Sequence, residues 1–89
     1  MAHHYVVVLV PKKGGGWRVH FPDFPGCHAE GARVELAVEA ATREVISWLE
    51  RARSIPTPQS YEEVRSDESW AHLRGIDWST AVISQVQIV

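Results

Sequence analysis

The chain is poor in cysteine, in net charge and in long apolar segments, and each shortage excludes a class of protein. Its single cysteine, Cys27, cannot form an internal disulfide framework. A formal net charge of -2 lacks the basic excess expected of proteins that wrap nucleic acid, and suits a basic protein partner better. The apolar run Val6–Val10 is far shorter than the roughly 20 residues of a membrane-spanning helix. With no signal-peptide pattern at the N-terminus, we expect a cytoplasmic protein without a membrane segment.

A length of 89 residues predicts one domain, residues 1–89, because chains divide only at two to three times this length. A domain of this size buries only about 60–65% of its unfolded surface, so a partner or self-association would supplement a thin core. The chain holds four tryptophans, whose large amphipathic rings are favoured at protein contacts. We therefore expect some of Trp17, Trp48, Trp70 and Trp78 to lie in an interface.

The first third of the chain has the pattern of antiparallel strands. Residues 5–10 form a continuous, largely β-branched run, which predicts a central strand covered on both faces or by a partner. Three glycines at 14–16 make a hairpin loop into a second strand at 17–21, where apolar and polar residues alternate. Pro25-Gly26 provides the fixed and then positive φ of a type II turn. A short third strand is expected at 27–30.

The rest of the chain predicts helices and one closing strand. Apolar residues at three- and four-residue spacing predict an amphipathic helix from Arg33 to about Arg53, without a capping side chain at its start. After an extended linker, Ser60 and Glu63 form a capping box that begins a short helix, with a second helical turn possible at 67–73. The uncharged residues 81–89 predict a strand that must be paired, within its own sheet or across a dimer. The expected fold class is α+β: a three-stranded antiparallel sheet, a long helix, a short helix and a terminal strand (β-β-β-α-α-β).

The segment Pro22-Asp-Phe-Pro-Gly-Cys-His28, followed by Gly31 and an Ala/Glu-rich helix, resembles the HicB-like antitoxin family. The likeness runs from Tyr5 through the Ile55-Pro-Thr-Pro58 linker to the last strand, and so covers nearly the whole chain. It implies a partial ribonuclease H-like fold and an antitoxin that binds a HicA-type toxin, a small ribonuclease that cleaves messenger RNA. Many members carry a further C-terminal DNA-binding domain. This sequence ends at Val89 without one, which puts DNA binding by this chain alone in doubt.

The favoured hypothesis is a non-enzymatic, antitoxin-like module that neutralises a HicA-type toxin by covering its catalytic surface. The predicted partner-binding residues are Trp17, His20, Asp23 and Phe24, since exposed aromatics on a small domain serve as interface anchors. Self-association as a dimer or tetramer is expected, through residues 81–89 or the first strand. The alternative, from a different class, is a stand-alone HicB-like homo-oligomer with a regulatory or structural role and no toxin partner.

An enzymatic or metal-binding role finds little support in the residues. Two-metal nuclease chemistry needs converging carboxylates, including one on the first strand, where residues 5–10 contain no acid. Asp23 and Glu30 have no accompanying acidic pair, so a metal-dependent nuclease is the least favoured alternative. Asp23 is expected instead to bond nearby backbone amides in its turn. His20, Cys27 and His28 are of the types that bind zinc, but their spacing matches no closed four-ligand site.

Lys12, Lys13 and Arg18 form a small basic patch near the glycine turn. Such a patch could touch phosphate, but a solvated hairpin tip is the favoured interpretation. No catalytic residue, cofactor or metal ligand is predicted.

Overall fold

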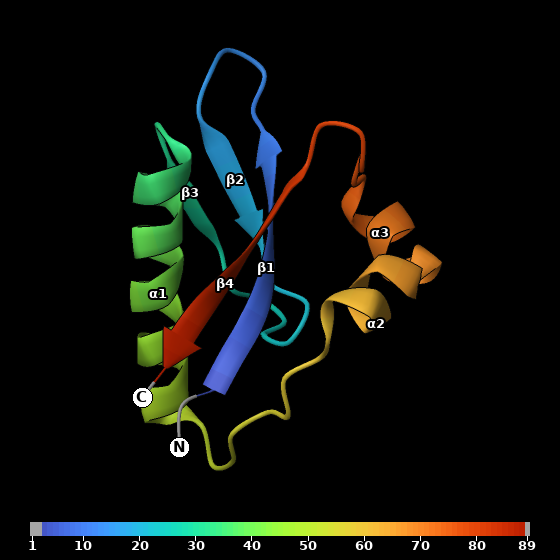
Figure 1. The fold of residues 1–89 in the computed structure, drawn as a ribbon. Helices are drawn as coiled ribbons and strands as arrows, with labels where there is room; N and C mark the ends of the chain where they lie inside the picture. Colours follow the sequence, from blue (N-terminus) through green and yellow to red (C-terminus); the bar gives the residue numbers. More distant parts are fainter. Residues whose placement is uncertain (1–2, 89) are drawn as a thin grey trace.

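The computed structural model describes residues 3–88, which form one four-stranded antiparallel sheet with helices on both faces (Figure 1). The predicted α+β class is confirmed, and the closing strand joins the same sheet as the first three. Two short helices stand where a short helix and a possible second turn were expected. In chain order the elements are β1 (His3–Pro11), β2 (Trp17–His20), β3 (Ala29–Gly31), α1 (Val34–Arg51), α2 (Tyr61–Ser66), α3 (Glu68–Arg74) and β4 (Val82–Ile88).

The strand order is β3-β2-β1-β4, so β1 lies inside the sheet. Val8, for example, pairs with His20 of β2 on one side and with Ile83 of β4 on the other. This confirms the predicted central strand. It also corrects the expectation that the first strand could mediate self-association, because both of its hydrogen-bonding edges are occupied within the chain. The sheet edges are β4 and the three-residue β3.

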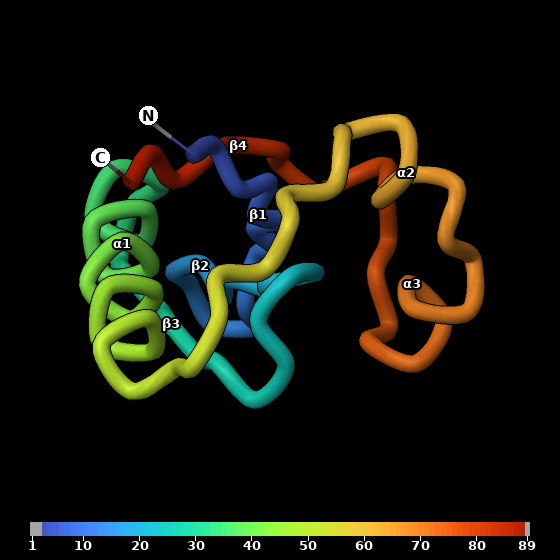
Figure 2. Tube along the Cα trace, turned by 90° about the horizontal axis from the view of Figure 1, so that it is seen from below, coloured from blue at the N-terminus to red at the C-terminus, as the bar shows by residue number. Residues whose placement is uncertain are grey.

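Successive side chains of β1 point to opposite faces of the sheet, and both faces are covered. Tyr5, Val7 and Leu9 pack with the buried side of α1, whereas Val6 and Val8 pack with α2 and its surroundings. All five side chains are at most 2% exposed. Figure 2 shows α1 on one side of the sheet and α2 and α3 on the other. The cover predicted from the apolar run is therefore supplied by the chain itself.

Local sequence signals determine the turns and helix ends as predicted. The Cys27 amide donates to the Phe24 carbonyl across 3.2 Å, and Gly26 has a φ of 86°, as in a type II turn. In the capping box, Ser60 Oγ accepts from the Glu63 amide and Glu63 Oε1 accepts from the Ser60 amide. Arg33, at the N-cap of α1, makes no side-chain capping bond.

Two contacts fix the linker and β3 against the rest of the fold. The Tyr5 hydroxyl donates to the Pro56 carbonyl across 2.9 Å, which ties the linker after α1 to the central strand. At the other end of the helix, Gly31 brings β3 so close to α1 that a Cβ at this position would lie 2.7 Å from the Ala37 Cα. Glycine is required here by close backbone approach.

Candidate functional site

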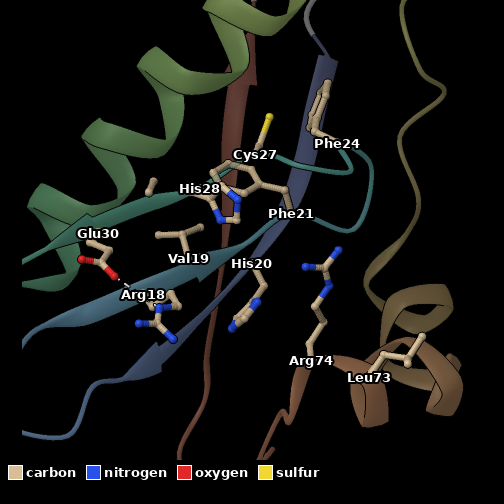
Figure 3. Close-up of a pocket in the computed structure, with 11 residues that line it drawn as sticks. Arg18, Val19, His20, Phe21, Phe24, Cys27, His28, Glu30, Leu73 and Arg74 are labelled. Carbon is tan, nitrogen blue, oxygen red and sulfur yellow. Dashed lines mark hydrogen bonds and ion pairs between the residues drawn. The ribbon is translucent and has the colours of Figure 1, made fainter.

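A groove of about 770 Å³ lies between β2, β3 and the end of α3 (Figure 3). It exists because α2 and α3 pack over β1 and β4 and leave β2 and β3 uncovered on the same face. Its polar lining consists of Arg18 and His20 on β2, His28 just before β3, Glu30 on β3, and Arg74 at the end of α3. Leu73 forms part of its rim.

His20 is the half-buried polar group of this groove. Its ring meets the Trp70 ring edge-on, with centroids 6.3 Å apart and an interplanar angle of 90°. Burial lowers the pKa of His20 below its ordinary value, and the charges of Arg74 and Arg18 and the neighbouring His28 lower it further. A neutral imidazole is therefore favoured near pH 7, which can donate one hydrogen bond and accept another.

The basic patch predicted at the hairpin is partly neutralised. Glu30 Oε1 lies 2.9 Å from Lys12 Nζ, and Glu30 Oε2 lies 3.2 Å from Arg18 Nε. These hydrogen bonds, with that from Lys12 first, lower the pKa of the Glu30 carboxyl. Arg18 and Glu30 are direct cross-strand partners, which accounts for their meeting. The solvated-tip interpretation holds for exposed Lys13, whereas Lys12 and Arg18 are engaged.

The four predicted partner-binding residues do not share one surface. His20 lines the groove, whereas Trp17 lies on the opposite face of β2 and packs, half-buried, against the α1 core. Phe24 is only 1% exposed, with its ring 4.7 Å from Tyr5 and 5.1 Å from Trp48 between centroids. Phe24 lines the groove together with His20, but its side chain packs in the core, and its contact with a partner stays a prediction.

Asp23 is engaged far along the chain, which corrects the expectation that it bonds nearby backbone amides. Its carboxylate accepts from the Gln59 side-chain nitrogen across 3.0 Å and from the Gln59 amide across 3.4 Å. Burial raises the pKa of Asp23, while the hydrogen bonds from Gln59 oppose that shift. The residue fastens the linker before α2 to the Pro22–Cys27 corner, a role that depends on tertiary structure.

The carboxylates and the thiol considered for nuclease or zinc chemistry are bonded to other partners or buried. Among residues 3–88 there is no group of three or more His, Cys, Asp or Glu side chains placed to hold a metal ion. Asp23 and Glu30 are each bonded to different partners, as described above. Cys27 is 8% exposed, and burial raises the pKa of its thiol, which disfavours the nucleophilic thiolate.

Leu73 and Arg74 are the functional candidates that the sequence reasoning missed. Leu73 is 83% exposed, the most exposed large apolar side chain among the described residues. α3 is too short to show a diagnostic apolar stripe, and its packing is set by Ala71 and Trp70. No local signal in the sequence indicates that Leu73 points into solvent beside β2.

Within residues 3–88, none of the three helices has both the length and the hydropathy needed to cross a membrane.

Comparisons with known proteins show the family of the chain and support its fold. The family model described as "HicB_like antitoxin of bacterial toxin-antitoxin system" matches residues 5–88. The solved N-terminal domain of the Burkholderia pseudomallei antitoxin HicB is 18% identical, with a TM-score of 0.73 over 98% of this chain and 99% of that chain. A toxin–antitoxin complex from Streptococcus pneumoniae gives 18% identity and a TM-score of 0.68, over 100% of this chain and 70% of that one.

A further solved structure, described as the HicA3 and HicB3 toxin–antitoxin complex, is 19% identical with a TM-score of 0.57, over 94% of this chain and 95% of that chain. None of the curated proteins compared with the chain matches it. At these identities the solved structures establish the fold, and the family model carries the assignment. Because that model spans nearly the whole described chain, the protein belongs to the HicB-like antitoxin family of bacterial toxin–antitoxin systems.

Proposed function

We propose that this protein is a non-enzymatic antitoxin that binds a HicA-type toxin and covers the surface with which that toxin cleaves messenger RNA. The observation that carries the proposal is the family match over residues 5–88. The likeness to chains of solved toxin–antitoxin complexes supports it through the fold. Since messenger RNA is the substrate of such toxins, the proposed site of action is the cytoplasm.

The proposed contact surface is the exposed side of α3 together with the adjoining groove. Leu73 projects beside the groove and offers an apolar anchor of the kind that fills a partner's pocket. His20 lies in the same groove and offers a neutral imidazole for hydrogen bonding. This surface retains one residue of the set predicted from the sequence. Trp17, Asp23 and Phe24 remain predictions for other parts of the contact.

Charge on the neighbouring helices favours a basic partner. The segment 61–74 carries four acidic and two basic side chains, and all six are exposed: Glu62, Glu63, Arg65, Asp67, Glu68 and Arg74. This acidic excess on α2 and α3 attracts a basic protein toward the two helices, whereas Arg18 and Arg74 line the groove itself. The mechanism is therefore steric occlusion assisted by electrostatic attraction, and needs no chemistry from this chain.

The test is co-expression with HicA-type toxins from the same genome, beginning with any adjacent gene. We expect growth rescue and a stable complex. Leu73→Ser should weaken the complex at least about thirtyfold, as loss of an interface hot spot does. Ile55→Ser is the matched control, because Ile55 is also exposed, at 59%, but lies on the linker away from the groove.

Three outcomes of this experiment distinguish the proposed function and surface from the alternative. Rescue that is lost with Leu73→Ser and kept with Ile55→Ser supports both the function and the surface. Rescue that is unaffected by Leu73→Ser keeps the antitoxin function and removes this surface. Absence of binding to every such toxin contradicts the function and favours the alternative, a stand-alone homo-oligomer with a regulatory or structural role. That alternative is favoured by one specific observation, the uncharged edge strand β4, which leads us to propose self-association as well.

A further inference from the structure

The groove between β2, β3 and α3 concentrates positive charge in a chain whose formal net charge is -2. Arg18 on β2 and Arg74 at the end of α3 line it together with the imidazole rings of His20 and His28. Figure 3 shows Arg74 extending from the end of α3 toward the sheet. A hollow lined by charge of one sign raises the local concentration of ions of the opposite sign, so this cluster favours an anion.

The carboxylate in the groove does not neutralise this cluster. Glu30 is the one acidic side chain among the lining residues that the structure describes. It is already paired with Lys12 Nζ across 2.9 Å and with Arg18 Nε across 3.2 Å. Within residues 3–88 these are the two ion pairs, so Arg74 has no acidic partner in that part of the chain. Its guanidinium group is therefore open to an external anion.

The nitrogen donors approach the groove from three segments of the chain and lie close enough to influence one another. Burial, and after it the charges of Arg74, Arg18 and His28, lower the pKa of His20. An anion among these groups would relieve their mutual repulsion. Donors on β2, before β3 and at the end of α3 can bond a phosphate group, which carries nearly two negative charges and three strong acceptor oxygens, from several directions. A planar carboxylate uses such an arrangement less completely.

The size and surroundings of the groove favour a small ligand over a nucleic acid strand. A volume of about 770 Å³ lies within the roughly 300–1,000 Å³ of small-molecule sites and exceeds the space of one phosphate group. Val19, Phe21 and Leu73 add apolar lining that can contact an organic part. A longer strand would bring further phosphates toward the acidic excess of residues 61–74, which repels them.

We propose that this groove binds a phosphate group, either as inorganic phosphate or as part of a small phosphomonoester. Arg74 and Arg18 supply the positive charge, and His20 and His28 donate hydrogen bonds to the phosphate oxygens. The proposal assigns a ligand to the groove that the antitoxin function does not require, and it can be tested without the toxin.

The test is a titration of the purified full chain, followed by two-dimensional ¹H–¹⁵N NMR at pH 7.5 and constant ionic strength. The probes are inorganic phosphate, adenosine monophosphate and acetate. The two phosphates should shift the amide signals of residues 18–20, 28–30 and 73–75 saturably, with a Kd of about 1 mM or lower, and acetate should bind at least about tenfold more weakly. Tighter binding of adenosine monophosphate than of inorganic phosphate would identify the phosphomonoester as the preferred source.

Two substitutions should change the affinity in opposite directions. Arg74→Gln removes the unpaired guanidinium group and should weaken phosphate binding about tenfold or more. Glu30→Gln removes the repelling carboxylate and frees Arg18, so it should tighten binding about twofold to fivefold. Arg43→Gln and Glu39→Gln are the matched controls, because both residues are exposed on α1, which covers the other face of the sheet. Both controls should bind like the wild type.

The proposal is overturned if binding does not saturate below about 10 mM, if acetate binds as tightly as phosphate, or if Arg74→Gln behaves like Arg43→Gln. It is also overturned if a single-stranded RNA of about ten nucleotides shifts the same signals at much lower concentration than the mononucleotide, since the groove would then belong to a nucleic-acid surface. Tighter binding by Glu30→Gln cannot result from unfolding, so a loss of structure cannot imitate the expected pair of effects.

Discussion

Replacing Gly31 with alanine should destabilise the protein by about 3 kcal/mol or more, as overpacking of a close backbone contact does in its severe cases. A Cβ at Gly31 would lie 2.7 Å from the Ala37 Cα and from the Leu36 carbonyl carbon. The Ala37 amide nitrogen would lie closer still, and ordinary contacts begin at 3.4 Å, so β3 and α1 would have to separate by at least about 0.7 Å. Both neighbours are backbone atoms, and no side-chain rotation can relieve the clash.

The loss of stability in Gly31→Ala arises from looser packing in the core next to this contact. Ala37, Ala41 and Val45 of α1 are 0% exposed and face the sheet. A gap of 0.5–1 Å forfeits roughly a quarter to a half of the dispersion energy of each affected atom pair, so a shift of α1 loosens many contacts at once. At about 4–8 °C per kcal/mol for a domain of this size, the melting temperature should fall by at least about 12 °C.

The assay is urea unfolding followed by tryptophan fluorescence, in which Trp48 reports on the core through its contact with Phe24. Gly26→Ala is the comparison, because a Cβ there meets nothing within 4 Å but must adopt a φ of 86°, at a cost of about 1–2 kcal/mol. If Gly31→Ala costs no more than Gly26→Ala, the close approach of β3 to α1 is not what requires glycine, and the reasoning is refuted.

Two further predictions concern the linker and the groove. Tyr5→Phe removes the hydroxyl that donates to Pro56 and should lower the free energy of unfolding by about 1 kcal/mol, whereas Tyr61→Phe, on an exposed ring, should change little in the same urea titration. Because the folded state lowers the pKa of His20, the unfolded chain binds the proton first, and stability should fall as pH drops below about 6.5. In the His20→Gln variant, the urea midpoint should depend less on pH between about pH 7.5 and 5 than in the wild type. If the midpoints of the two proteins fall in parallel, His20 is not the source of the pH dependence.

Features of this fold that depend on neighbouring residues could be predicted from the sequence. The β-branched run predicted the central strand, Pro25-Gly26 predicted the turn, and Ser60 with Glu63 predicted the capping box. In each case the physical cause acts over a few residues: a steric restriction, a positive φ, or a side chain reaching an amide three positions away. Element boundaries shifted by only one or two residues, as at the two ends of α1.

Features that depend on distant residues could not be predicted. Phe24 lies in a turn, where exposure is the ordinary expectation, but the corner folds back so that its ring packs on Tyr5 and Trp48. Asp23 meets Gln59 across 36 positions for the same reason. The groove itself results from where α2 and α3 come to rest on the sheet, and no local pattern specifies that position. Which aromatic side chains remain exposed depends on which of them pack into the core, and tertiary structure determines that choice.

The groove and the outer edge of β4 lie toward opposite sides of the sheet, so the strand order leaves both surfaces accessible at the same time. The groove lies over β2 and β3, whereas self-pairing uses the outer edge of β4, with β1 between them. In a two-fold dimer the order becomes β3-β2-β1-β4-β4-β1-β2-β3, which leaves a groove toward each end. A dimer should therefore bind two toxin molecules without competition between the two interfaces. Accordingly, Gln85→Lys should weaken self-association yet keep toxin binding, while Leu73→Ser should weaken toxin binding yet keep self-association. Loss of both activities in either variant would show that the surfaces overlap or are coupled.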